Sequence, residues 1–223
     1  MTYHPPANLT GDPSTGGEAE RLIDAVLYDF GNVLVGWDPY GAYAGLDRGV
    51  VDAFFADVDF RALNHERDAG GTWAQARELV SASHPHHVEL LERYVEHFAS
   101  TLTGPVEGSA ELVQELRDLG LRLYGLTNWS AELYPHAAHA APATTLMDDV
   151  LVSGREGLAK PDPAIFALAI DRFGLDPART LFTDDSPANV DAAARLGLRT
   201  HLFDGTPGLR AALRDLGVPV PSS

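Results

Sequence analysis

The stretch IDAVLYDFG at residues 23–31 decides the fold of this chain. It is a short apolar run that ends at Asp29 and soon meets a glycine, so it predicts a buried strand with a loop at its carboxyl end. Two later apolar runs end in polar residues in the same way, at Thr127 and at the pair Asp184-Asp185. Because helix-like segments separate these strands, we predict an α/β fold with a parallel sheet and helices on both faces.

The segments between the predicted strands carry helix start and stop signals. Asp162 followed by Pro163 is typical of an N-cap with proline in the first turn, and Ser186 followed by Pro187 repeats the pattern. A glycine comes directly after the apolar pattern, at the position where each of these helices should end. We expect helices at residues 109–119, 163–173, 187–196 and 209–216, and further strands at residues 148–153 and 199–203.

Between residues 38 and 103 the apolar spacing becomes helical, with few β-branched runs. Thr72 followed by Gln75 resembles a capping box that opens a helix at residues 73–81, and residues 89–100 predict another amphipathic helix. We therefore expect a small helical insert at 38–103. It would interrupt an α/β core made of residues 21–37 and 104–223.

Composition and charge exclude several classes of protein. The 223 residues are 45% hydrophobic and 22% charged, and the formal net charge is −16. A chain this acidic repels nucleic acids and anionic membrane surfaces, so neither is an expected partner. The chain has no cysteine and no long apolar run, and residues 1–20, rich in Pro, Gly, Ser and Thr, resemble a flexible N-terminal arm rather than a signal peptide. We expect a cytoplasmic protein, either a monomer or a homodimer.

Ligands of open parallel sheets bind beyond the carboxyl ends of the strands, which is where the polar strand ends should meet. Asp29, Asp184 and Asp185 would repel one another there, and a hard divalent cation with oxygen ligands, Mg²⁺, would relieve that repulsion. The hydroxyl of Thr127 and the ammonium of Lys160 beside the metal would form a receptor for a phosphoryl group. One carboxylate could then attack phosphorus.

This constellation resembles the haloacid dehalogenase-like (HAD) hydrolase superfamily. The matching motifs are DFGNVL at residues 29–34, LTN at 126–128, KPDP at 160–163 and FTDDSPAN at 182–189, in the order that the family has them. The resemblance covers about residues 22–205. It implies a Rossmann-like core, a helical cap formed by the insert, and a phosphatase that acts on a small phosphorylated metabolite.

The resemblance also implies roles for individual residues. Asp29 would be the nucleophile that forms an aspartyl-phosphate. The metal would be held by Asp29, Asp184, Asp185 and the backbone carbonyl of Gly31. Thr127 and Lys160 would bind the phosphoryl oxygens. Asn128 and, from the cap, Arg67 are candidate contacts to the substrate.

One position departs from the family pattern. Phosphatases of the family usually carry a second Asp two residues after the nucleophile, which protonates the leaving group, and that position is Gly31 here. Loss of a general acid typically lowers the rate by about 10²–10⁴-fold, with less effect on a good leaving group. The pattern Asp-x-Gly-Asn-Val is also similar to a glucose-1-phosphate phosphatase-type branch, which suggests a sugar phosphate as substrate.

Two other functions stay open on the sequence alone. A metal-independent 2-haloacid dehalogenase would use the same aspartate to attack carbon and needs no second Asp. A module that binds a phosphorylated metabolite without turning it over would also function without the second Asp. Among single residues, Gly31 is open to interpretation as a turn glycine, and Trp37 and Trp73 as either core or pocket residues. His84, His86 and His87 are open to interpretation as a metal site or as a solvated loop.

Overall fold

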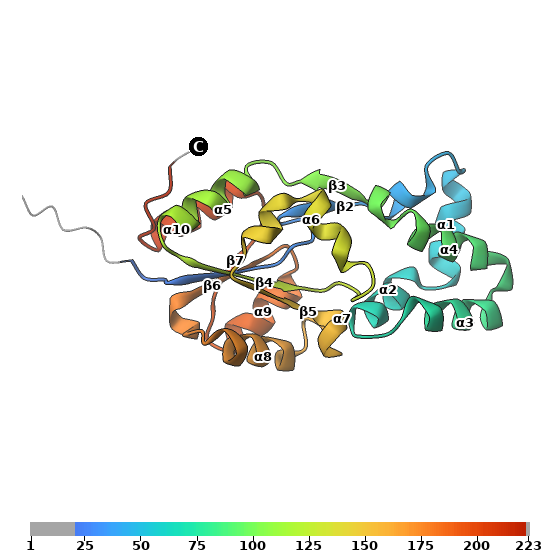
Figure 1. Ribbon diagram of the computed structural model, residues 1–223. Helices are drawn as coiled ribbons and strands as arrows, with labels where there is room; N and C mark the ends of the chain where they lie inside the picture. The colour runs from blue at the N-terminus through green and yellow to red at the C-terminus, as the bar shows by residue number, and fades with distance from the viewer. Residues whose placement is uncertain (1–20, 222–223) are drawn as a thin grey trace, which may run out of the picture.

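A computed structural model describes residues 21–221, and its centre is a five-stranded parallel sheet with the order β5-β4-β1-β6-β7 (Figure 1). The strands are β1 (Ala25–Tyr28), β4 (Arg122–Thr127), β5 (Asp149–Val152), β6 (Thr180–Asp184) and β7 (Arg199–Leu202). Helical connections join these strands, as a parallel arrangement requires. The predicted Rossmann-like α/β fold is confirmed.

Helices cover both faces of the sheet, which explains why its central strand is apolar throughout. Val26 and Tyr28 of β1 point into one core cluster and Ala25 and Leu27 into the other, and all four are at most 1% exposed. The first face packs against α5 (Ser109–Asp118) and α10 (Thr206–Asp215), and the second against α8 (Pro163–Phe173) and α9 (Pro187–Arg195) (Figure 1).

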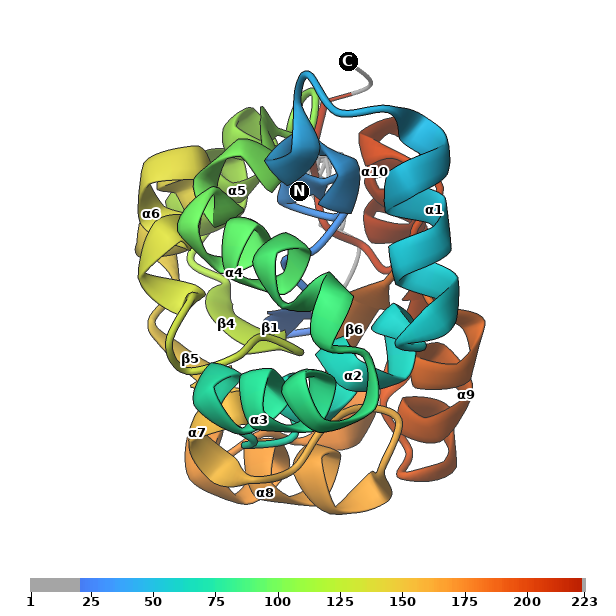
Figure 2. The same ribbon diagram turned by 90° about the vertical axis from the view of Figure 1, so that its right-hand side faces the viewer.

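Four helices form a separate layer beyond the carboxyl edge of the sheet, and we call them the cap (Figures 1 and 2). They are α1 (Arg48–Asp57), α2 (Phe60–Asp68), α3 (Trp73–Ser83) and α4 (Val88–Glu96). The chain enters and leaves this layer through an antiparallel ribbon of β2 (Val35–Trp37) and β3 (Leu102–Pro105). The division into cap and core at residues 38 and 103 stays a prediction.

Short helices complete the connections. They are the α-helical turns α6 (Ala137–Ala140) and α7 (Ser153–Glu156) and the 3₁₀ segments Pro39–Tyr43, Pro85–His87, Phe98–Thr101, Tyr134–His136, Pro142–Leu146 and Pro177–Arg179. In the described part of the chain, no helix has both the length and the apolar character needed to cross a membrane.

Aromatic rings fill the interior of the cap. Phe60 packs on Tyr94 with ring centroids 4.9 Å apart, and Trp73 packs on Tyr94 at 5.3 Å. The indole N–H of Trp73 also donates to Ser130 Oγ at 3.2 Å, which ties α3 to the loop after β4. Trp73, whose role the sequence left open, is therefore a core residue.

The predicted helix signals are confirmed at three helix ends. The capping box is present, because Thr72 Oγ1 accepts from the backbone N–H of Gln75 and the Gln75 side chain accepts from the N–H of Thr72. Asp162 caps α8 by accepting from the N–H of Ala164, and Gly174 ends that helix with a φ of 57°.

Three local predictions are wrong. Residues 89–100 are not one helix, because α4 ends at Glu96 and a 3₁₀ turn follows. Ser186 does not cap α9 with its side chain; instead its N–H donates to Asp184 Oδ1 at 2.8 Å. The last helix begins at Thr206, one turn earlier than expected, because Pro207 suits its first turn.

The histidines before α4 do not form a uniformly solvated loop. His86 is exposed, but His87 is buried and its Nε2 lies 2.9 Å from Asp57 Oδ2 at the end of α1. No local pattern indicated this carboxylate, because it lies 30 residues away in the sequence. The predicted arm at residues 1–20 lies outside the described residues.

Candidate active site

Three acidic side chains lie together at the carboxyl edge of the sheet. Asp29 directly follows β1, and its backbone N–H donates to the carbonyl of Thr183 in β6 at 3.0 Å. Asp184 ends β6 and Asp185 comes next. One carboxylate oxygen from each of the three acids lies within 4.8 Å of the others. Adjacent parallel strands thus bring these residues together although they are far apart in the sequence.

The ammonium group of Lys160 lies between two of these carboxylates. Its Nζ is 2.9 Å from Asp29 Oδ1 and 2.7 Å from Asp184 Oδ2, and the side chain is 0% exposed. Lys160 is the one lysine in the whole sequence. Its single charge compensates only part of the charge of three carboxylates, so this edge of the sheet keeps an excess of negative charge.

Burial sets the protonation of this cluster. Burial raises the pKa of Asp29 to about 7, against the attraction of Lys160, and it also raises the pKa of Asp185. Burial opposes the charge of Lys160 too, but the carboxylates of Asp29 and Asp184 outweigh it and raise its pKa. Lys160 therefore stays charged, while the acids lack a full set of positive partners.

The donor set fits a magnesium ion. All three side chains offer carboxylate oxygens, which Mg²⁺ prefers, and the ion would supply the positive charge that the cluster lacks. Asn32 Nδ2 donates to Asp185 Oδ2 at 3.2 Å and so orients the more exposed acid. Asp29, Asp184 and Asp185 would hold the metal, with the predicted carbonyl of Gly31 beside them.

Two asparagines fix the groups around Lys160. Asn128 and Lys160 exchange two hydrogen bonds of 2.8 Å, in which Asn128 Nδ2 donates to the Lys160 carbonyl and the Lys160 N–H donates to Asn128 Oδ1. Asn189 Nδ2 donates to both carboxylate oxygens of Asp184 at 3.0 Å. Asn128 therefore positions the lysine loop, and Asn189 holds one of the lysine's two carboxylate partners.

Thr127 presents an unpaired hydroxyl at the end of β4. Its Oγ1 is fully buried and has no hydrogen-bond partner among the described residues. β4 is the neighbour of β1 on the side opposite β6, so this hydroxyl lies at the same edge of the sheet as Asp29. Buried hydroxyls are normally paired, so a free one here suits an oxygen-rich ligand such as a phosphoryl group.

Gly31 does not need to be glycine for its backbone. Its φ is not positive, whereas the neighbouring Asn32 takes a φ of 56°. A Cβ atom built on Gly31 would meet nothing within 4 Å. Gly31 lies in a turn, because the N–H of Val33 donates to the carbonyl of Phe30 at 3.2 Å, but this turn does not require glycine, and a side chain at this position has space.

Two cavities lie between the cap and the carboxyl edge of the sheet. The smaller, of about 110 Å³, includes Gly31 in its lining, and the larger, of about 1030 Å³, includes Lys160. Four residues line both cavities: Trp37, Asn64, Asp68 and Asn128.

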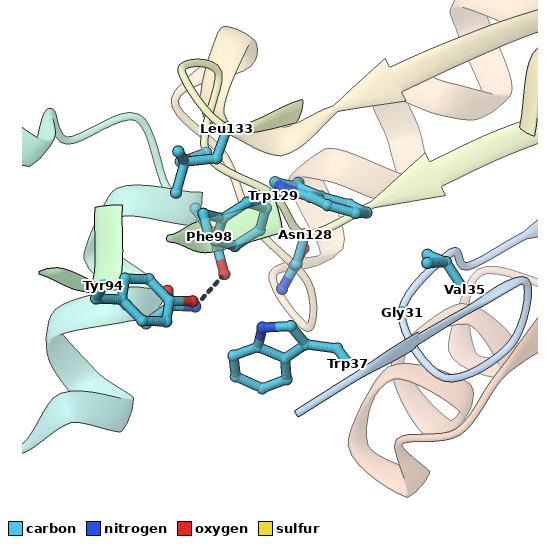
Figure 3. A pocket seen from close by; sticks show the side chains of 11 residues that line it. Gly31, Val35, Trp37, Tyr94, Phe98, Asn128, Trp129 and Leu133 are labelled. Atoms are coloured by element: carbon cyan, nitrogen blue, oxygen red, sulfur yellow. Dashed lines mark hydrogen bonds between the residues drawn. The ribbon is translucent and has the colours of Figure 1, made fainter. Parts of the chain in front are cut away.

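Aromatic side chains dominate the wall of the smaller cavity. Figure 3 shows Trp37, Tyr94, Phe98 and Trp129 gathered around it, together with Asn128. Trp37, whose role the sequence left open, therefore faces a pocket. The walls combine flat apolar surfaces with a few amide and carboxyl groups, which is typical of sites for small molecules.

Comparison with known proteins matches the motifs to a family. The family model described as haloacid dehalogenase-like hydrolase matches residues 23–197. The chain belongs to this family. A HAD family enzyme from Bacteroides thetaiotaomicron, solved as a magnesium complex, has the same fold, with a TM-score of 0.67 and 20% identity over 87% of this chain and all of that one.

Curated relatives of this HAD-like hydrolase include phosphatases and a dehalogenase. N-acetylmuramic acid 6-phosphate phosphatase from Pseudomonas aeruginosa is 30% identical over 80% of each chain. (S)-2-haloacid dehalogenase 4A from Burkholderia cepacia is 27% identical over 41% of this chain and 40% of its own. Drimenol cyclase drtB from Aspergillus calidoustus is 26% identical over 82% of this chain, which spans only 34% of that protein.

The structure brings together most of the predicted site residues of this HAD-like hydrolase. Asp29, Asp184, Asp185 and Lys160 form one cluster, while Thr127 and Asn128 come from the end of β4. Arg67 differs from them. It is buried, lies against Gly71 and pairs with Glu66, and it lines neither of the two cavities. Substrate contact by Arg67 stays a prediction.

Sequence reasoning missed the residue next to Arg67. Asp68, the last residue of α2, lines both cavities. Its position in a helix of mixed composition carried no motif, so only the way the cap folds over the sheet identifies it. No role was predicted for Asn189 either, because its contact with both oxygens of Asp184 depends on where β6 ends.

Proposed function

We propose that this hydrolase is a Mg²⁺-dependent phosphatase that cleaves a small phosphorylated metabolite through an aspartyl-phosphate on Asp29. One observation supports the proposal above all others: the fully buried Lys160 bridges Asp29 and Asp184. The unpaired hydroxyl of Thr127 lies at the same edge of the sheet and adds a second group for a phosphoryl oxygen. A phosphatase among the relatives, 30% identical over most of both chains, supports the same reaction.

The proposed reaction has two steps at phosphorus. A carboxylate oxygen of Asp29 forms a bond to phosphorus while the bond to the leaving oxygen breaks. Water then forms a bond to phosphorus, the bond to Asp29 breaks, and inorganic phosphate leaves. Lys160 and Thr127 would hold the phosphoryl oxygens in both steps and stabilise their charge. Bound Mg²⁺ would supply further positive charge to the phosphoryl group.

The side chains that line the smaller cavity support a sugar phosphate as the substrate. Trp37 and Trp129 offer flat apolar faces, and Asn64 and Asn128 offer amides that can hydrogen-bond hydroxyl groups. The resemblance of residues 29–33 to the glucose-1-phosphate phosphatase-type branch favours the same class. The cap helices would close over the substrate and exclude water. The net charge of −16 favours such a small ligand over a nucleic acid.

A panel of phosphorylated metabolites tests the proposal. Sugar 1-phosphates, sugar 6-phosphates and acyl phosphates would be incubated with the chain in Mg²⁺ or in EDTA, and released phosphate would be measured. We expect phosphate release in Mg²⁺ and none in EDTA. Asp29→Asn should abolish it, while Asp191→Asn on the exposed surface of α9 should not. Full activity of the Asp29→Asn variant would refute the nucleophile.

The absence of a second acid at Gly31 also favours a 2-haloacid dehalogenase, and a dehalogenase is among the relatives. Three clustered carboxylates argue against it, because attack on carbon beside a substrate carboxylate gains nothing from further negative charge. Halide release from 2-haloacids in EDTA, without phosphate release from the panel, would establish this alternative. Binding of beryllium fluoride without any turnover would indicate a non-catalytic module instead.

A further inference from the structure

The proposed phosphatase reaction needs a proton for the leaving oxygen, and the usual donor position is Gly31. Glycine has no side chain to donate one. The space beside Gly31 is open, since a Cβ there would meet nothing within 4 Å, and Gly31 lines the smaller cavity. A proton donor must therefore come from another residue that reaches the same cavity.

Asp68 reaches that cavity from the opposite layer. It ends α2 in the cap and lines both cavities, so its carboxyl lies where the part of the substrate outside the phosphoryl group would lie. Asn64, one helical turn earlier, donates from Nδ2 to Asp68 Oδ2 at 3.0 Å. This bond, together with a hydrogen bond from the backbone N–H of Ser130, holds the Asp68 carboxyl at the wall of the cavity.

The surroundings of Asp68 favour its protonated form near neutral pH. Burial raises the pKa of Asp68 to about 7, and the charge of Asp29 acts in the same direction. The backbone N–H of Ser130 and the charge of Lys160 oppose this shift. Tyr94 of α4 also faces the carboxyl. An acid whose pKa lies near the working pH can both give and take a proton.

Other groups around the cavities are poorer donors. Lys160 is held by two carboxylates. Burial raises the pKa of the Tyr94 hydroxyl, which makes it a weaker acid. His65 lines the larger cavity but is exposed to solvent and does not line the smaller one. Asp68 alone among these combines a suitable acidity with a place beside Gly31.

We propose that Asp68 of the cap replaces the missing acid and protonates the leaving oxygen. The inference rests on the proposed phosphatase function. As the phosphorus–oxygen bond of the substrate breaks, the proton of the Asp68 carboxyl moves to the leaving oxygen and yields a neutral alcohol. The Asp68 carboxylate then takes a proton from the attacking water as water bonds to phosphorus, the bond between phosphorus and Asp29 breaks, and inorganic phosphate leaves. Asp68 ends each cycle protonated, and protons balance.

The assignment makes catalysis depend on cap closure. The nucleophile Asp29 belongs to the core, while Asp68 belongs to the cap, so cleavage of an unactivated alkyl phosphate needs both layers in contact. A substrate too large for the cap to close over would bind its phosphoryl group and still lack the proton. Selection by the cap would then act on the rate of cleavage as well as on binding.

Leaving-group dependence tests the role of Asp68. The wild type and Asp68→Asn would be compared on p-nitrophenyl phosphate, whose nitrophenolate leaves without a proton, and on the best sugar phosphate of the panel. We expect kcat/KM for the sugar phosphate to fall by about 10²–10⁴-fold and that for p-nitrophenyl phosphate to stay within about threefold. Glu66→Gln, an exposed carboxyl on the same helix, is the matched control and should change neither.

A rescue variant completes the test. Adding Gly31→Asp to Asp68→Asn places an acid at the family position, where space is open, and should restore much of the sugar phosphate activity. Equal losses on both substrates, or no loss on either, would overturn the role of Asp68 while leaving the phosphatase function intact. A wild type inactive on both substrates in Mg²⁺ would overturn both proposals.

Discussion

Replacing Lys160 by Met should destabilise the metal-free protein strongly at neutral pH. Met keeps most of the volume of the side chain, so the change removes the charge rather than the packing. The ammonium contacts Asp29 at 2.9 Å and Asp184 at 2.7 Å, and neither the lysine nor Asp184 has any exposed side-chain surface. Two buried carboxylates would then lose their positive partner.

The size of the expected loss in folding stability follows from the burial of these groups. Removing one partner of a buried ion pair typically costs about 3–5 kcal/mol. For a domain of this size each kcal/mol lowers Tm by about 2–4 °C, so the variant should melt about 6–20 °C below the wild type at pH 7 in EDTA. Arg172→Met breaks a more exposed pair with Glu156 and should cost less than about 1 kcal/mol.

The difference in stability between the variant and the wild type should also depend on pH. Without Lys160 the folded pKa of Asp29, already raised by burial, rises further above its unfolded value. A group with a raised folded pKa binds protons on folding, so acid stabilises the variant relative to neutral pH. The wild-type pKa is about 7 and that of the variant is higher, so the gap between variant and wild type should narrow as the pH falls from about 9 towards about 7. Thermal or urea unfolding in EDTA measures it. A gap below about 1 kcal/mol, or one independent of pH, would refute the reasoning.

Two further substitutions test the support of the site. Asn189→Ala removes both side-chain amide bonds to the buried Asp184 and should cost about 1–3 kcal/mol in urea unfolding; an unchanged midpoint would contradict the assigned role. Gly125→Ala should cost about 1–3 kcal/mol, because its Cβ would lie 2.7 Å from the ring of Phe30. Gly31→Ala, its matched control, has open space and should change Tm little; equal melting of the two glycine variants would count against the packing argument.

The fold was predictable because each signal for it is local. The run at residues 25–28 is apolar on both sides, which only a strand buried on two faces requires, and helix N-caps such as Asp162 mark where connections begin. Parallel strands share a carboxyl edge, so the convergence of Asp29 with Asp184 followed from the topology. Helix ends were less predictable. Phe98 continues the apolar spacing of α4 although the helix has ended at Glu96.

The contacts between cap and core could not be predicted from local patterns. Asp68 and Arg67 are neighbours in α2, yet one lines the cavities and the other packs against Gly71. A helix turns about 100° per residue, so adjacent residues face different surroundings, and the sequence does not say which face meets the core. The pairing of His87 with Asp57 is likewise a product of tertiary packing.

A chain with a solitary lysine, whose amine is buried between two carboxylates, carries a natural chemical reporter. Reagents that acylate side-chain amines have this one residue to modify, and only when its carboxylate partners release it. The rate of label incorporation, read by mass spectrometry, would therefore report how often Lys160 leaves Asp29 and Asp184, without any engineered probe.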